Sequence, residues 1–392
     1  MKTVEVRTKA QIRDFLELPG RLYGDNPYWI RPLDKDIEAV FDPEQNRFFQ
    51  KDGADCIRWL LLDDQETVIG RVAAFIDPDT VHKNNKQPTG GMGFFECIND
   101  QTAAKVLFDT AQQWLEARGM EAMDGPINFG NRDRWWGLLV KGFDKEPNYC
   151  MPYNPPYYRE LFENNGFQCY FKQLTYCRPV QEDLRPRLKR VGEELLQNPN
   201  YEFRTLERSK LEQYAEDFRT IYNKAWSSHT GVGEMSKKQA RAIMKTMKPI
   251  LDPEIMWFAY HHDQPVGFYI MIPELNQVFK HFNGKFRLIE KLRLLWMRRT
   301  GKIHKMFGVI FGVIPEEQGR GVHLGLVEGF RAFAQADPNY QYKEFEMNWI
   351  GDFNPKMIKT AELIGGELCK LHHTYRKLFD PNATFERMPI IE

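Results

Sequence analysis

The clearest hydrophobic pattern lies near the start of the last quarter of the chain. Residues 305–313 (KMFGVIFGV) are almost continuously apolar, which predicts a buried strand. After Gly321, apolar residues recur at helical spacing from Leu326 to Ala334 and predict a helix with one buried face. The polar turn between them, IPEEQGRG, therefore connects a strand to the start of a helix.

Two segments share one pattern 200 positions apart, at Asn154 and at Asn354. Each has an aromatic residue, Asn and Pro, then a helical stretch, then Gly, and then an aromatic-rich strand. Asn is a favoured helix cap, and Pro suits the first helical position because no N–H is needed there. The pattern predicts an Asn-capped helix in both places.

A second pair of segments, around Gly70 and Gly267, reads strand, polar turn, strand in both cases. The two offsets are nearly equal, which indicates a duplicated domain. We expect the halves to be residues 1–180 and 181–392, with a linking helix after the prolines and charges that follow Tyr176. Strands and helices alternate irregularly, so we predict the α+β class, with a mixed, largely antiparallel sheet flanked by helices in each half.

Composition and charge argue against several classes of function. Lys plus Arg and Asp plus Glu both total 54, so the net charge is zero and a general nucleic-acid binder is not supported. The N-terminus has no signal-peptide core, and no apolar stretch is long enough to span a membrane. The six cysteines form no CxxC pair, and the two His-His pairs lack partners at zinc-like spacing. We expect a cytoplasmic protein with free thiols and no metal site.

The turn at 314–321 has the chemistry of an anion site. Its glycines allow a sharp bend, and successive N–H groups then meet a helix N-terminus, which suits a phosphate or a pyrophosphate. A P-loop would need Gly-Lys-Ser/Thr, which is absent from the chain. The G-x-G-x-x-G dinucleotide fingerprint also fails, because Leu324 occupies the place of its third glycine.

The pattern that fits is V-x-P-x-x-Q-x-x-G, matched by Val313, Pro315, Gln318 and Gly321. It resembles the acyl-CoA pyrophosphate loop of the GCN5-related N-acetyltransferase (GNAT) superfamily. A strand, an Asn-initiated helix, a Gly and a final strand follow in the family's order. The resemblance implies two tandem GNAT-like domains. The first half lacks the loop, so we expect it to be a degenerate copy that does not bind CoA.

The resemblance also implies roles for individual residues. The backbone around the turn would hold the pyrophosphate, the strand end would contact the pantetheine arm, and the helix cap would lie near the thiol. The cofactor, acetyl-CoA or another acyl-CoA, would thus be held by Val313, Gln318, Gly319, Arg320, Gly321, Val322, His323 and Asn354. His323 departs from the family, which prefers a small residue at that place.

Catalytic residues cannot be copied from the family. Its general-acid Tyr corresponds here to Ala361 or Glu362, and the strand before the turn lacks a carboxylate. Three replacements are candidates. Glu346 or Asp352 could take a proton from an amine, and Tyr375 could act as the acid.

Three further segments have open interpretations. Trp226 and His229 lie where the family lines its acceptor pocket, or they belong to a packed helix end. The loop at 124–156 is either a wall of the acceptor pocket or a seam between the halves, and the seam is favoured. Residues 285–305 predict a basic helix with an apolar stripe, which packs on the core, forms a lid or touches a membrane surface.

The hypothesis is an acyl-CoA-dependent N-acyltransferase that acts on the amine of a small molecule or a peptide, by direct attack in a ternary complex. Nucleic acid and stable membrane association are not expected, and the oligomeric state is open. Two alternatives remain: an aminoacyl-tRNA-dependent transferase of the same tandem fold, and a non-catalytic acyl-CoA-binding sensor or scaffold.

Overall fold

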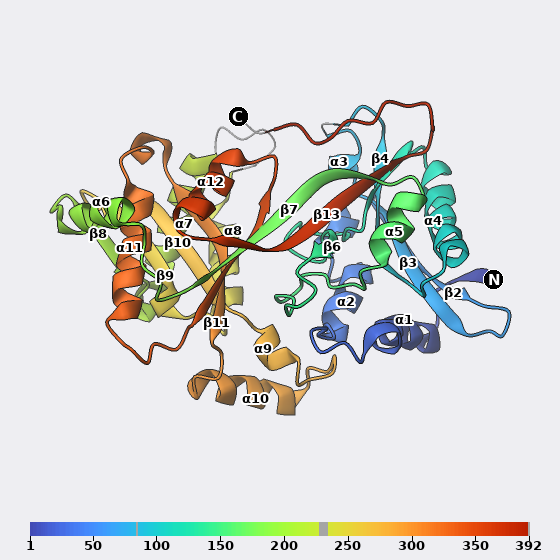
Figure 1. Ribbon diagram of the computed structural model, residues 1–392, viewed down its shortest axis with the longest axis horizontal. Coiled ribbons are helices and arrows are strands. Elements are labelled where there is room, and N and C mark those ends of the chain that lie inside the picture. Colours follow the sequence, from blue (N-terminus) through green and yellow to red (C-terminus); the bar gives the residue numbers. More distant parts are fainter. Residues whose placement is uncertain (84, 227–233, 391–392) are drawn as a thin grey trace.

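One continuous sheet runs through the molecule, with helices packed against it (Figure 1). The structure, a computed structural model, describes residues 1–83, 85–226 and 234–390. The strand order is β1-β2-β3-β4-β5-β13-β7-β12-β11-β10-β9-β8, and β6 pairs with β13 off this path. The predicted α+β class with a mixed, helix-flanked sheet is confirmed.

The first half supplies most of the strands at one end of the sheet. Its elements are β1 (Lys2–Glu5), α1 (Lys9–Tyr23), α2 (Asp34–Phe41), η1 (Arg47–Gln50), β2 (Asp55–Leu62), β3 (Val68–Ile76), α3 (Pro78–Val81), β4 (Thr89–Cys97), α4 (Gln101–Glu116), β5 (Ala122–Gly125), β6 (Leu138–Lys141), α5 (Tyr158–Asn164) and β7 (Gln168–Pro179).

The second half repeats this order after the linking helix α6 (Pro186–Gln197). It continues with β8 (Tyr201–Thr205), η2 (Arg208–Lys210), α7 (Leu211–Trp226), α8 (Lys237–Met247), η3 (Pro253–Ile255), β9 (Met256–His261), β10 (Gln264–Pro273), α9 (Asn276–Phe279), α10 (Leu288–Arg299), β11 (Lys305–Val313), η4 (Pro315–Glu317), α11 (Val322–Gln335), β12 (Glu344–Gly351), α12 (Pro355–Leu363) and β13 (Glu367–Leu378).

Both halves have the same strand directions. The first four strands of each half form an antiparallel series, and a helix then crosses to a parallel fifth strand. The parallel pairs are β4 with β5 and β11 with β12. A parallel pair needs such a crossover, which α4 and α11 supply. The shared order supports a duplication.

The halves exchange their final strands. β7 ends the first half but pairs with β12 of the second, and β13 ends the second half but pairs with β5 of the first. The two exchanged strands also pair with each other over most of their length, so they cross the middle of the molecule together (Figure 1). Neither 1–180 nor 181–392 therefore forms a complete sheet by itself.

The exchange also brings two cysteines together. Cys177 of β7 and Cys369 of β13 form a disulfide, with 5.7 Å between their Cα atoms. The expectation that all thiols are free was wrong for this pair. The reason lies in the pairing of β7 with β13, which brings together residues 192 positions apart. Cys369 lies at an irregularity of this pairing, between Leu368 and Lys370.

The repeated Asn-Pro pattern has two different outcomes. Asn354 caps α12, where its side chain accepts from the Met357 N–H at 3.1 Å, and Pro355 takes the first helical position as predicted. Asn154 does not cap a helix, because α5 begins only at Tyr158. Its buried side chain instead accepts from the Leu139 N–H at 2.7 Å and donates to the Leu139 carbonyl at 3.1 Å.

The loop at 124–156 lies on the seam, as favoured from the sequence. The Tyr149 N–H donates to Glu274 at 2.9 Å, and the Pro147 carbonyl accepts from Asn276 at 2.8 Å. Asn148 reaches Asn348 of β12 at 2.8 Å. This loop of the first half therefore closes over the sheet of the second half, and it also lines two of the cavities described below.

Candidate functional site

The strand–turn–helix connection has the predicted boundaries: β11 ends at Val313 and α11 begins at Val322. The connection between them, residues 314–321, is called the glycine loop. Gly319 and Gly321 have φ values of 80° and 85°, a left-handed conformation that costs other residues energy. A Cβ on Gly321 would also lie 3.1 Å from Leu195 and from Val191 of α6. Both glycines are therefore required by the shape of the loop.

The glycine loop presents backbone amides at a helix N-terminus. The amides of Gln318 and Arg320 donate within the loop, to the carbonyls of Pro315 and Glu317. The amides of Val322 and His323 belong to the first turn of α11, where intrahelical acceptors are lacking. Together with the helix dipole they favour an anion at this end.

An acidic residue inside the glycine loop is held by hydrogen bonds from two residues of neighbouring strands. Glu317 is buried and accepts from the Tyr201 hydroxyl at 2.7 Å, while its other oxygen lies 2.7 Å from Nδ1 of His261. Burial would raise the pKa of Glu317, but Tyr201 and His261 outweigh it and lower the pKa. The sequence alone did not indicate this bracing, since its residues come from β8 and β9.

A cavity opens where β11 and β12 diverge. The strands pair only over residues 305–308 and 344–347. Val309 is an extra residue in β11 opposite β10, a bulge that increases the local twist. The resulting splay cavity holds about 270 Å³. Its lining is Tyr269, Gly308, Val309, Ile310, Phe311, Val327, Phe345, Met347, Asn348, Trp349, Ile350, Asn354, Met357, Thr360 and Ile364.

The free edge of β11 suits an extended polar ligand. Among the described residues, β11 has a strand partner beyond Gly308 only on its β10 side. Backbone groups on the other edge can therefore bond to a ligand that lies in the splay like an added strand. The splay cavity and the glycine loop lie along the same strand end, so one molecule with a pyrophosphate and a pantetheine arm could use both.

Glu346 is held in a buried ionic cluster next to this cavity. Its Oε2 accepts from Lys370 Nζ at 2.8 Å and from Asn148 Nδ2 at 2.6 Å, and its Oε1 pairs with Lys305. Burial would raise the pKa of Glu346, but the two ammonium groups outweigh it and lower the pKa to about 2. A carboxylate with so low a pKa is a weak proton acceptor and acts here as a fixed anion.

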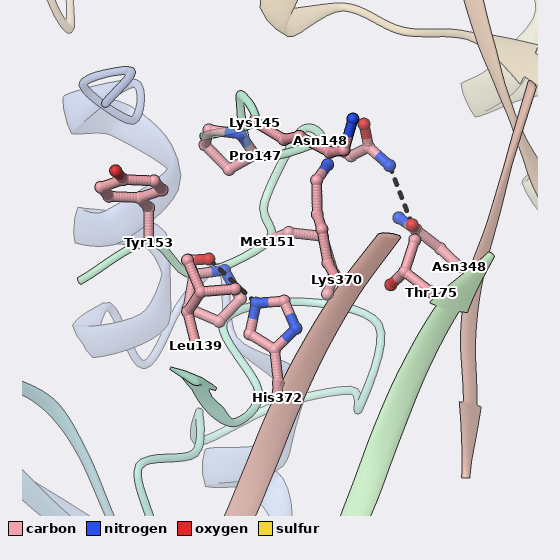
Figure 2. A pocket seen from close by; sticks show the side chains of 11 residues that line it. Leu139, Lys145, Pro147, Asn148, Met151, Tyr153, Thr175, Asn348, Lys370 and His372 are labelled. Carbon is pink, nitrogen blue, oxygen red and sulfur yellow. Dashed lines mark hydrogen bonds between the residues drawn. The ribbon is translucent and has the colours of Figure 1, made fainter. Parts of the chain in front are cut away.

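A small polar pocket lies beside the cluster, at the seam (Figure 2). Its lining is Leu139, Lys145, Pro147, Asn148, Met151, Pro152, Tyr153, Thr175, Asn348, Lys370 and His372. Asn348 also lines the splay cavity, so the two spaces share a wall. The polar pocket is too narrow for a water-sized sphere, and a ligand could enter only if the loop at 145–153 shifted.

Three buried polar atoms of this pocket have no hydrogen-bond partner among the described residues: Oδ1 of Asn148, Oγ1 of Thr175 and Nδ1 of His372. Each of these side chains is about 1% exposed. Leaving a buried polar atom unpaired costs free energy, so such atoms call for a ligand or a water. Two of the three are acceptors, which favours a donor such as an amine.

His372 is neutral in this environment. Burial lowers its pKa to about 4, and Nε2 lies 3.2 Å from the Pro152 carbonyl. A carbonyl accepts only from N–H, so the proton lies on Nε2 and the lone pair on Nδ1. His372 and Lys370 project from the same face of β13 toward the loop at 145–153 (Figure 2). The sequence does not mark either residue as part of a site, because no pattern near them points to the pocket.

The first half contains a cavity of its own, which is mostly apolar. Its lining is Leu16, Pro19, Tyr23, Trp29, Ile30, Arg31, Pro32, Ile37, Arg71, Phe94, Phe95, Glu96, Pro126, Trp135, Gly137, Leu138, Pro147, Met151, Pro152, Tyr153, Asn154 and Tyr158, around a volume of about 80 Å³. Four loop residues, Pro147, Met151, Pro152 and Tyr153, line the polar pocket as well. The three spaces therefore follow one another across the seam.

Glu96 is the centre of a hydrogen-bonded group in the apolar cavity, although Nε of Arg71 and Nε1 of Trp135 have no hydrogen-bond partner among the described residues. Glu96 accepts from Tyr23 at 2.8 Å and from Tyr158 at 2.7 Å, and Arg71 lies 3.3 Å from it. Burial raises the pKa of Glu96 despite the charge of Arg71. At the start of α4, the Asp100 carboxylate caps the helix and accepts from the Ala103 N–H at 2.8 Å.

The remaining site residues predicted from the sequence are Asp352, Tyr375, Trp226 and His229. Asp352 accepts from the Lys172 N–H at 3.0 Å and pairs with Arg387. Tyr375 is fully buried in the core of the first half, because β13 is exchanged, and its hydroxyl donates to Glu163 at 3.0 Å. Trp226 is the last residue of α7, and His229 lies outside the described residues.

Comparisons with known proteins agree with this architecture. No family model matches the chain. The chain is 26% identical over 381 residues to the bacterial ceramide synthase of Caulobacter vibrioides, covering 96% of this chain and 97% of that protein. It is 25% identical over 379 residues to Protein YghO of Escherichia coli, covering 94% and 93%. No helix in the described part of the chain is both long and apolar enough to cross a bilayer.

Two solved structures share the fold at 10% identity. One is the GCN5-related glucosamine N-acetyltransferase region of a fungal multi-domain β-N-acetylglucosaminidase, with a TM-score of 0.55; the match covers 96% of this chain and 38% of that one. The other is a tandem GNAT protein from the clavulanic acid biosynthesis pathway, with a TM-score of 0.54 and coverage of 97% and 99%. The chain therefore has the fold of the tandem GNAT proteins.

Proposed function

We propose that this protein is an acyl-CoA-dependent N-acyltransferase whose acceptor is a long-chain amine. The observation that carries the proposal is the splay cavity between β11 and β12, which follows the same strand as the glycine loop. The loop amides and the dipole of α11 suit a pyrophosphate, and the free edge of β11 suits a pantetheine arm. The first half, with Asp100 at the start of α4, is proposed not to bind CoA.

The acceptor class is supported by the similar protein named a ceramide synthase. A ceramide is the amide of a fatty acid with a long-chain amino alcohol. The amine would enter the polar pocket, where Asn148, Thr175 and His372 offer unpaired polar atoms. The first carbons of the hydrocarbon chain would lie in the apolar cavity that shares four wall residues with this pocket.

In the proposed reaction the amine nitrogen attacks the thioester carbonyl. A C–N bond forms, the C–S bond breaks, and the sulfur leaves with the electron pair as the thiolate. The amine must enter neutral, and the ammonium group of Lys370 favours this because it repels a second cation. The nitrogen becomes acidic once it has attacked, and Nδ1 of neutral His372 can accept its proton. With a pKa of about 4, His372 is a weak base, and its role rests on the free lone pair in the pocket. Glu346 would hold Lys370 and Asn148 in position.

The test is a calorimetric titration with CoA and with a long-chain acyl-CoA, followed by turnover with a long-chain 2-amino alcohol. Amide formation is measured by mass spectrometry and thiol release by absorbance. The control acceptors are a diol of the same length, which lacks the amine, and ethanolamine, which lacks the chain. Amide formed only from the long-chain amine supports the proposal.

Other outcomes separate the alternatives. Binding of acyl-CoA without turnover of any amine would favour the sensor or scaffold hypothesis. Absence of binding to CoA and to acyl-CoA would overturn the proposal, and transfer from an aminoacyl-tRNA would then be tested next.

A further inference from the structure

Helix α10 carries the largest cluster of exposed apolar side chains in the described part of the chain. Their exposed fractions are Leu288 71%, Ile289 77%, Leu292 58%, Leu295 48% and Trp296 58%. At about 100° per residue these positions fall within an arc of roughly 120° on one side of the helix. We call this surface the α10 stripe.

Helix α10 is packed against the second half, so the exposure of the stripe does not come from a detached helix. The opposite side of α10 holds the buried Met297, and Leu294 packs against the core of the second half. Arg298 donates to the Leu251 carbonyl at 3.2 Å, which ties the end of the helix to the domain. The helix is thus fixed with its apolar stripe outward, at the lower edge of the molecule in Figure 1.

The stripe lies in a strongly basic segment. Between residues 285 and 302 the only acidic residue is Glu290, whereas the basic residues are Lys285, Arg287, Lys291, Arg293, Arg298, Arg299 and Lys302. Lys291 and Arg293 fall on either side of the stripe by the same helical spacing. The whole chain has no net charge, so this concentration is local.

We propose that α10 docks on an anionic membrane surface, with the stripe in the interfacial region and the Lys and Arg side chains against lipid headgroups. An apolar face with Trp and Leu, flanked by cations, is the composition of interfacial helices. A second copy of this chain is a poorer occupant, because two stripes placed face to face would bring two sets of like charges together. The proposal goes beyond the proposed function and does not rest on it.

The position of the stripe fits delivery of an apolar substrate. The Gly284 carbonyl, just before α10, accepts from the Asp34 N–H at 2.8 Å, and Lys35 lies 4.0 Å from the Phe286 ring centre. Asp34 starts α2, two residues after Pro32, and both Arg31 and Pro32 line the apolar cavity. Docking through α10 would therefore bring this wall of the cavity close to the lipid.

The experiment is vesicle flotation of the full chain, with phosphatidylcholine alone and with phosphatidylcholine plus phosphatidylglycerol. We expect binding only to the anionic vesicles, and loss of that binding at high salt. The double variant Leu292→Glu, Trp296→Glu and the charge variant Lys291→Glu, Arg293→Glu should each reduce vesicle binding at least tenfold. Leu196→Glu, an exposed apolar position on α6, is the matched control and should bind as the wild type does.

The proposal is overturned by two results. One is wild-type protein that does not float with anionic vesicles. The other is a dimer, measured by light scattering, that the Leu292→Glu, Trp296→Glu variant converts to a monomer without any vesicle binding by the wild type. Calorimetric titration of the same variants with CoA separates this result from the proposed function, since the stripe is not part of the glycine loop or the splay cavity.

Discussion

Glu346 of β12 and Lys370 of β13 form a buried ion pair across β7, with 2.8 Å between Oε2 and Nζ. The two residues are 2% and 4% exposed. The strand that separates them comes from the first half, so the pair exists only in the exchanged sheet. Asn148 of the first-half loop bonds to the same oxygen, which ties the seam to the cluster.

Lys370→Met should destabilise the protein strongly, because it removes one of the two cations that compensate the buried Glu346 carboxylate. We expect a loss of about 3–5 kcal/mol in the free energy of unfolding, measured with urea. Lys105→Met, which removes an exposed i,i+4 ion pair with Asp109, is the control and should change stability by about 0.5 kcal/mol or less. Equal effects of the two variants would argue against a buried pair.

The protein should lose stability on mild acidification. Burial lowers the pKa of His372 to about 4, from its ordinary value of 6.5. Between pH 6.5 and pH 4 the unfolded chain binds a proton that the folded protein does not bind. The free energy of unfolding therefore has its full value above pH 6.5 and falls as the pH drops toward 4. The shift corresponds to a loss of roughly 3 kcal/mol.

Thermal unfolding between pH 8 and pH 4 checks this expectation. His372→Gln should make the profile less steep over that interval without flattening it, because burial also lowers the pKa of His373 to about 4. His82→Gln, an exposed control, should leave the slope unchanged. A wild-type profile that stays flat down to pH 4 would contradict the buried, neutral state of His372.

The disulfide should be measurable as a difference in thiol count. In denaturant, Ellman titration should find four thiols without reductant and six after reduction, since only Cys177 and Cys369 are paired. Cys177→Ser should lower the free energy of unfolding by about 4 kcal/mol, because the bond closes a long loop in the unfolded chain. Six thiols without reductant, in protein kept oxidised during purification, would refute the pairing.

The two Asn-Pro segments should respond differently to the same substitution. Asn354→Ala removes a helix cap and should cost about 1 kcal/mol. Asn154→Ala removes two buried hydrogen bonds to Leu139 and should cost more, about 2–4 kcal/mol. Urea unfolding of both variants measures the difference, and equal costs would mean that Asn154 is a simple cap after all.

Gly321→Val should weaken CoA binding at least tenfold in the calorimetric titration. Valine is strained at a φ of 85°, and its Cβ would lie 3.1 Å from Leu195, so the loop must shift away from the pyrophosphate. The strain alone is worth about 1–2 kcal/mol. Gly119→Val is the control for backbone strain at a position outside the site, because Gly119 has a φ of 80° and no atom near its Cβ position. Unchanged affinity in Gly321→Val would remove the glycine loop from the cofactor site.

Sequence patterns predicted the glycine loop, the bounds of β11, the start of α11 and the Asn354 cap. These features depend on residues a few positions apart, and apolar periodicity, cap preference and glycine conformation are local properties. The same local signal failed at Asn154, where the nearby strand β6 offered its side chain better hydrogen bonds than a helix start.

Of the candidate site, the sequence predicted the form of the glycine loop but not the polar pocket. His372, Lys370, Asn148 and Thr175 come from separate segments of both halves, and their spacing along the chain carries no pattern. The carboxylate of Glu346 was visible in the sequence, but its low pKa depends on two lysines brought close by folding.

The sequence by itself determined the duplicated order of elements and the form of the glycine loop, because each half repeats its own local patterns. Tertiary structure alone decided which half each final strand completes. A strand in the middle of a sheet needs hydrogen bonds on both sides, and either half could supply them to β7 or β13. The exchange of these two strands then placed the disulfide, the ionic cluster and the polar pocket on the seam.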